Sequence, residues 1–183
     1  MHPMLNIATK AAREAGDLIR RYVNQIDKIK IEQKDPNDFV SEVDRQAERT
    51  IVGILRRAYP DHSIMGEEFG KQGQNDSEYE WIIDPLDGTT NYLHSLGHCA
   101  VSIALKHRGR ITQGVVYDPI RDELFSATRG EGATLNNRRI RVSSLPSMQG
   151  ALLGTGIPFR SSQNIDLYLD TMRVLIPGTA GIR

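Results

Sequence analysis

The heptad DPLDGTT, residues 84–90, places two carboxylates, a proline, a glycine and two hydroxyls next to one another. It follows WII, which is typical of the end of a buried strand, and ligand-binding groups collect at strand ends in layered sheets. Because Pro85 fixes its own φ and lacks a backbone donor, we expect the chain to turn here. The first and fourth residues of a β-turn lie within about 7 Å at Cα, so Asp84 and Asp87 would come together.

The paired aspartates have the chemistry of a metal site. Carboxylates this close could reach two cations about 3.5–4 Å apart, the separation used in two-metal phosphoryl chemistry. The motif offers only oxygen ligands, which favours hard cations such as Mg²⁺ over Zn²⁺. Gly88 lets a ligand approach the backbone, and Thr89 with Thr90 could open a short helix whose free N–H groups would receive a phosphate.

An ordinary polar turn is the simpler interpretation of the heptad taken alone, because the same residues are common in turns and helix caps. Residues 66–68, GEE, offer a further carboxylate, although a solvated pair of acids is the simpler interpretation. Asp44 lies three residues after Ser41, in the pattern of a capping box. The heptad alone therefore leaves both interpretations open.

Length and composition are those of one ordinary globular domain. The chain has 183 residues, 39% hydrophobic and 25% charged, and roughly 70% of the unfolded surface can be buried at this size. Lys+Arg and Asp+Glu are equal at 23 each, so no global field attracts nucleic acid or an anionic membrane. The single cysteine, Cys99, the polar N-terminus and the lack of a run of about 20 apolar residues favour a cytoplasmic protein with no membrane partner.

Apolar periodicity predicts the elements that position the heptad. Helical spacing predicts helices over residues 4–24, 41–59 and 164–176, and Gly16 in the first apolar stripe suggests a close helix–helix contact. Strand patterns with short turns between them cover residues 81–84, 99–105, 111–117, 123–128 and 138–144, and weaker ones cover 28–32 and 150–156. Short turns imply mainly antiparallel pairing, so we predict an α+β layered fold in one domain over residues 1–183.

The combination of GEE (66–68), WIIDPLDGTTNY (81–92) and HCAVSIAL (98–105) resembles the inositol monophosphatase family. These are Mg²⁺-dependent, lithium-sensitive phosphatases related to fructose-1,6-bisphosphatase. NDFVSEVD (37–44) and GTGIPF (154–159) match in order and spacing, and the pattern is most similar to the bacterial SuhB-type branch. The resemblance covers essentially the whole chain and implies the layered α/β sandwich of the sugar phosphatases, with N-terminal helices and a mainly antiparallel sheet.

Residue by residue, the resemblance implies a centre with two metal ions. Glu67 and Asp84, with the backbone carbonyl of Leu86, would hold the first Mg²⁺. Asp84 would also contact a second Mg²⁺, which it would share with Asp87.

The resemblance also implies a phosphate site and an activated water. Asp87 and the backbone N–H groups of Gly88 and Thr89 would bind the substrate. Asp44 and the Thr89 hydroxyl would orient and activate the attacking water. The cap interpretation of Asp44 is compatible with this role, because a carboxylate at a helix N-terminus is held in place.

The implied activity is hydrolysis of myo-inositol monophosphates to inositol and phosphate by metal-activated water, in a homodimer. The alternative is a binding role. SuhB-type members are associated with RNA polymerase and Nus antitermination complexes in ribosomal RNA transcription, so these proteins, or RNA, would be partners and phosphatase activity would be secondary.

The chain departs from the family pattern in one block. The family carries a Trp-Asp block, followed by small residues, whose Asp completes the second metal site, whereas the only Trp here is Trp81. We therefore expect residues 1–183 to be the N-terminal portion of the family fold, and the isolated chain to be a weak or inactive catalyst.

Overall fold

The computed structural model describes residues 2–28, 31–35, 38–74, 76–158 and 163–183. Contacts group the chain into two compact units, one of Met1–Lys34 with Asp38–Arg141 and one of Asp35–Asn37 with Val142–Arg183. A single domain over residues 1–183 stays a prediction. No helix within the described ranges is long and apolar enough to cross a membrane.

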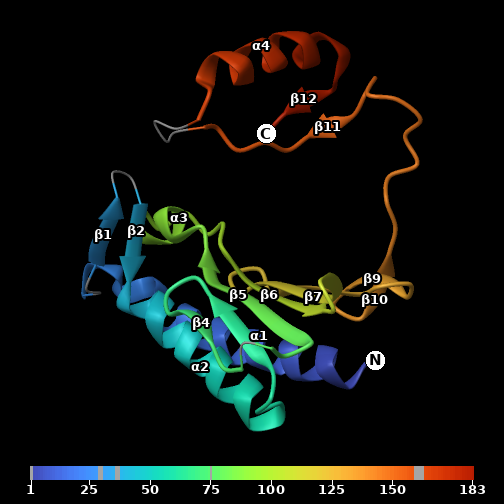
Figure 1. Cartoon of the computed structure of the whole chain (residues 1–183). Helices are drawn as coiled ribbons and strands as arrows, with labels where there is room; N and C mark the ends of the chain where they lie inside the picture. Colours follow the sequence, from blue (N-terminus) through green and yellow to red (C-terminus); the bar gives the residue numbers. More distant parts are fainter. Residues whose placement is uncertain (1, 29–30, 36–37, 75, 159–162) are drawn as a thin grey trace. The chain divides into compact units, whose positions relative to one another are not determined.

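An eight-stranded sheet forms the frame of the larger unit, in the order β10-β9-β8-β7-β6-β5-β3-β4 (Figure 1). Its strands are β3 (Ser63–Gly66), β4 (Gly70–Gln72), β5 (Tyr79–Asp87), β6 (Ala100–His107), β7 (Arg110–Asp118), β8 (Glu123–Thr128), β9 (Gly132–Leu135) and β10 (Arg138–Ile140). All neighbours pair antiparallel except β3 and β5, which run parallel. The predicted α+β class with mainly antiparallel pairing is therefore confirmed.

Two helices, α1 (Pro3–Tyr22) and α2 (Glu42–Ala58), lie on one face of this sheet (Figure 1). Their apolar stripes and the sheet residues beneath them form one core, in which Trp81 and Leu55 are completely buried. The close contact predicted for Gly16 is with the sheet rather than with the other helix. A Cβ at Gly16 would lie 2.4 Å from the ring of Tyr117 on β7, so only glycine lets α1 come so near the strand.

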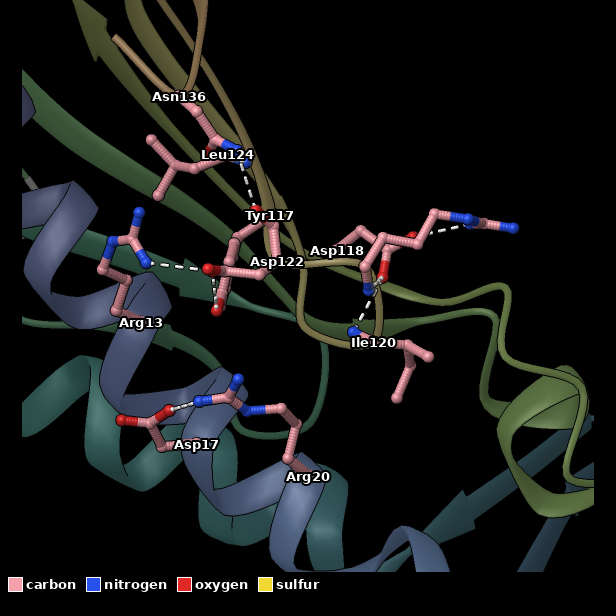
Figure 2. A network of polar contacts seen from close by, with 10 residues as sticks. Arg13, Asp17, Arg20, Tyr117, Asp118, Ile120, Asp122, Leu124 and Asn136 are labelled. Carbon is pink, nitrogen blue, oxygen red and sulfur yellow. Dashed lines mark hydrogen bonds and ion pairs between the residues drawn. The ribbon is translucent and has the colours of Figure 1, made fainter.

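A polar network fastens α1 to the turn after β7 (Figure 2). Arg13 forms an ion pair with Asp122 at 3.1 Å, and the Tyr117 hydroxyl donates to the same carboxylate oxygen over 2.8 Å. The Arg13 guanidinium also lies 5.2 Å from the centre of the Tyr117 ring. The side chain of Asn136 binds the Asp122 carbonyl and the Leu124 amide, both at 2.9 Å. These contacts tie α1 and the two sheet turns together.

The remaining elements are short. In the larger unit η1 (Val23–Lys28) follows α1, β1 (Ile31–Asp35) pairs with β2 (Asp38–Ser41), and α3 (Thr89–Leu93) follows β5. In the smaller unit β11 (Leu152–Leu153) pairs parallel with β12 (Gly181–Ile182), and α4 (Ile165–Leu175) continues into η2 (Ile176–Gly178). None of the described side chains of α4 is buried.

Most predicted elements are found, and the differences lie in their bounds and in the shortest strands. The strand predicted over 138–144 ends at Ile140, the one predicted over 150–156 is reduced to Leu152–Leu153, and the one predicted over 28–32 begins at Ile31, with residues 29–30 outside the described part of the chain. Strands β2, β3, β4, β9 and β12 were not predicted, because two to four residues are too few to show alternation. The last residue of the GTGIPF block, Phe159, also lies outside the described residues.

Candidate metal and phosphate site

The DPLDGTT heptad lies on a bulged strand. Strand β5 continues past Asp84 to Asp87, so the predicted β-turn is wrong. Asp84 is opposite Ser102 and Asp87 is opposite Ala100, which sets three steps on β5 against two on β6. One extra residue in one strand defines a β-bulge, and proline is tolerated there because it cannot donate to the ladder. A bulge between Asp84 and Asp87, rather than a β-turn, therefore sets the directions of these two aspartates.

Asp84 is the most perturbed acid of this region. Burial, the neighbouring Glu67 and the charge of Asp87 together raise its pKa to about 8, and burial is the largest of these causes. The Leu86 amide donates to Asp84 Oδ1 over 3.2 Å and opposes the rise. Glu67 and Asp87, two other predicted metal ligands, therefore both act on Asp84, as expected of a buried carboxylate with acids beside it.

Asp44 and Thr89 are brought together from distant parts of the chain. The predicted capping box is confirmed, because Asp44 Oδ2 accepts from the amide of Ser41 over 2.9 Å and from its hydroxyl over 2.5 Å. The other oxygen, Oδ1, accepts from the Thr89 hydroxyl over 2.9 Å. The same hydroxyl lies 3.0 Å from the Leu86 carbonyl. Asp44 is 2% exposed, so both of its oxygens are held in fixed directions.

Gly88 is the N-cap residue, immediately before the short helix α3. Its φ of 88° is left-handed, and a Cβ here would lie 2.8 Å from the His98 carbonyl oxygen. Thr89 is the first residue of α3, which confirms the predicted helix start. The first N–H groups of a helix have no intrahelical acceptor. The amides of Thr89 and Thr90 therefore remain available to a ligand.

Glu48 also belongs to this region and was not predicted from the sequence. Glu48 lies on α2, one turn after Asp44, and is 0% exposed. Its carboxylate accepts from the backbone amides of Glu68 and Phe69. The signal available in the sequence was the place of Glu48, an acidic residue within the apolar stripe of α2, between Ala47 and Ile51.

The candidate donors fit a divalent cation in part. Within the described ranges, no group of three or more His, Cys, Asp or Glu side chains is arranged to hold a metal ion. Two features nevertheless fit a hard cation. Every candidate donor is an oxygen. The pKa of Asp84 is raised by its burial and by repulsion from Glu67 and Asp87, and a bound cation would offset both effects.

Known proteins of one family are similar to this chain over nearly its whole length. The sequence profile of the inositol monophosphatase family matches residues 1–178. The Nus factor SuhB of Pseudomonas aeruginosa is 57% identical over 187 residues, covering 100% of this chain and 69% of that protein. The solved extragenic suppressor protein suhB of Bartonella henselae has a TM-score of 0.95 at 39% identity, over 100% of this chain and 70% of that one. A solved inositol monophosphatase of Anabaena (Nostoc) has a TM-score of 0.82 at 39% identity, over 98% of this chain and 65% of that one.

Proposed function

The chain belongs to the inositol monophosphatase family, and from this premise we propose that it is an Mg²⁺-dependent phosphomonoesterase that hydrolyses myo-inositol monophosphates to inositol and phosphate. The observation that carries the proposal is the gathering of acids around Asp84, whose pKa is raised by burial and by the neighbouring Glu67 and Asp87. Asp84 and Asp87 share the heptad with Thr89, whose hydroxyl donates to Asp44. Such a combination supports metal-assisted hydrolysis better than a purely structural turn.

The carboxylates are the proposed metal ligands. Glu67 and Asp84, with the Leu86 carbonyl, would hold one Mg²⁺, and Asp84 and Asp87 would share a second. Bound Mg²⁺ would neutralise charge on the phosphate and lower the pKa of a coordinated water. In the family, further residues complete the second site, and this chain spans 69% of its Pseudomonas relative.

The neutral donors of the heptad are the proposed phosphate site. The amides of Gly88 and Thr89 would donate to phosphate oxygens, where negative charge is favoured by the helix start. The left-handed backbone of Gly88 presents this edge of the chain without a Cβ. Donors that are already oriented cost no reorganisation when charge develops on the phosphate.

The Thr89–Asp44 pair is the proposed base. The Thr89 hydroxyl donates to Asp44 over 2.9 Å, which leaves the lone pairs of its oxygen free to accept from a water molecule. A proton released by that water would pass to the hydroxyl oxygen while the hydroxyl proton moves to Asp44. General-base help of this kind contributes about 10²- to 10⁴-fold.

The test combines binding with turnover. Calorimetric titration of Mg²⁺ and release of phosphate from inositol 1-phosphate would be measured for the wild-type chain and for Asp87→Asn. We expect Asp87→Asn to weaken Mg²⁺ binding and to abolish any phosphate release. Equal Mg²⁺ affinity in the two proteins, or release that persists in Asp87→Asn, would overturn the proposal.

A second candidate function is favoured by the name of the 57% identical relative, Nus factor SuhB. We propose that this chain also contacts RNA polymerase and Nus complexes, or their RNA, through a surface other than the metal site. Asp87→Asn separates the two functions, because a binding role would survive the substitution. Lithium sensitivity and a homodimeric state stay predictions from the family, and a cytoplasmic location stays a prediction from the sequence.

A further inference from the structure

Glu48 is a charged side chain with no exposure at all, on the face of α2 that packs into the core. Glutamate is almost never fully buried unless its charge is partnered. Here Oε2 accepts from the Glu68 amide over 2.7 Å, and Oε1 accepts from the Phe69 amide over 3.2 Å. The carboxylate therefore binds the turn that follows β3.

The same turn is shaped around this carboxylate. A Cβ at Gly66 would lie 1.8 Å from Glu48 Oε1 and 2.4 Å from its Cδ, so the carboxylate occupies the space of a side chain there. On its other side, the turn is tied to β5, because the Glu67 amide donates to the Ile83 carbonyl over 3.1 Å. Glu67 is thus held between a bond to β5 and two bonds to α2.

The side chain of Glu67 is exposed and lies close enough to Asp84 to raise the pKa of that carboxyl. The anchoring carboxylate and the exposed carboxylate are therefore different residues with different partners. Both hydrogen bonds from Glu48 to the turn are with backbone amides, those of Glu68 and Phe69. These bonds fix the backbone on either side of the position that carries the Glu67 side chain.

Asp44 and Glu48 are four residues apart on α2, so they lie on the same side of the helix, one turn from each other. Asp44 holds Thr89 and Glu48 holds the turn that carries Glu67. We propose that Glu48 is a positioning residue of the metal site, and that α2 sets the spacing between Glu67 and Thr89 through these two buried carboxylates. The proposal rests on the proposed role of Glu67 as a metal ligand.

The test is the affinity for Mg²⁺, measured by calorimetric titration, in Glu48→Gln. Glutamine has one acceptor oxygen, so its NH₂ group would face one of the two amide donors. Residues that orient a metal ligand typically change affinity by about 10- to 100-fold when replaced, and we expect a loss in this range. Wild-type affinity in a folded Glu48→Gln would overturn the proposal.

The matched control is Ser63→Ala. Ser63 is also buried, on the same strand as Gly66 but at its opposite end, and its hydroxyl donates to the Tyr79 carbonyl over 3.2 Å. This variant loses a buried hydrogen bond without touching the turn. We expect unchanged Mg²⁺ affinity, and an equal loss of affinity in both variants would reduce Glu48 to a general structural role.

A second variant of Glu48 and a comparison with Asp87→Asn complete the test. Should Glu48→Gln fail to fold, Glu48→Asp keeps the charge but withdraws the carboxylate by one methylene, and we expect a several-fold loss of Mg²⁺ affinity. Wild-type affinity in folded Glu48→Asp would also overturn the proposal. Asp87→Asn separates this inference from the proposed function: Mg²⁺ binding that is insensitive to Asp87→Asn contradicts the metal site itself, whereas sensitivity to Asp87→Asn alone contradicts only the role of Glu48.

Discussion

The Thr89 hydroxyl donates to Asp44 Oδ1 over 2.9 Å, between residues that are 45 positions apart in the chain. The other oxygen of Asp44 completes the cap of α2. One carboxylate therefore joins the start of a long helix to the start of the short helix after β5. The cap and the site are not alternative roles of Asp44, because each uses a different oxygen.

Replacing Thr89 by alanine should show how much this hydrogen bond contributes to stability and to phosphate release. Thr89→Ala leaves Asp44 Oδ1 without its donor, which we expect to destabilise the protein by about 1–3 kcal/mol, as measured by denaturant unfolding. Phosphate release should fall by about 10²-fold or more. Thr89→Ser keeps the hydroxyl and should stay near wild type in both measurements. Equal stability of the alanine and serine variants would show that the bond contributes nothing.

Gly88 should tolerate no side chain. Its φ of 88° disfavours any other residue, and a Cβ would meet the His98 carbonyl at 2.8 Å. We expect Gly88→Ala to lower the free energy of unfolding by roughly 2–4 kcal/mol, combining backbone strain with steric overlap.

Gly109 provides the matched control for this substitution. Its φ of 79° is similar, but a Cβ there meets nothing within 4 Å. Gly109→Ala should therefore cost only the backbone term, about 1 kcal/mol. The difference between the two variants measures the close approach to His98, and equal losses would show that no such approach exists.

The space at Gly66 gives a third prediction. Gly66→Ala places a methyl group where the Glu48 carboxylate lies, so we expect a loss of about 2–4 kcal/mol in unfolding free energy. Gly53→Ala, in the middle of α2 with open space around it, should instead stabilise by about 0.5–1 kcal/mol. Thermal unfolding of both variants checks the opposite signs. A Gly66→Ala protein as stable as wild type would mean that Glu48 does not fill this space.

Local features of the site could be predicted from the sequence, whereas features that depend on a partner strand could not. The capping box of Ser41 and Asp44 is written in four consecutive residues, and it was found where expected. The segment from Pro85 to Gly88 has a composition that is compatible with a turn or with a bulge. Only the pairing of β5 with β6 decides between them, and that pairing depends on residues far along the chain.

Two contacts show the same limit of prediction from the sequence. The small side chain of Gly16 indicated that something comes close to α1, but the partner, Tyr117, lies about a hundred residues away, on β7. Glu48 carries a charge, which normally indicates a solvated face. Its partners are backbone amides 20 and 21 residues further on, and no side-chain pattern records them.

The raised pKa of Asp84 gives a prediction on pH and metal. Without metal, the folded protein keeps a proton on Asp84 up to about pH 8, whereas an ordinary aspartic acid loses it near 3.8. Between these values the folded state binds more protons than the unfolded state, so stability should fall as pH rises from about 4 to about 8. Because Asp84 is partly exposed, the difference that Asp84→Asn removes should be on the order of 1–2 kcal/mol at pH 8.

Chemical unfolding at a series of pH values, with EDTA or with Mg²⁺, measures this effect. With EDTA, Asp84→Asn should be more stable than wild type at pH 8 and equal to it near pH 4. With Mg²⁺, the order at pH 8 should reverse, because the cation stabilises the ionised wild-type carboxylate and the asparagine variant binds it poorly. Parallel pH profiles for the two metal-free proteins would contradict the raised pKa. A stability advantage of Asp84→Asn that persists in saturating Mg²⁺ would instead contradict the role of Asp84 as a metal ligand.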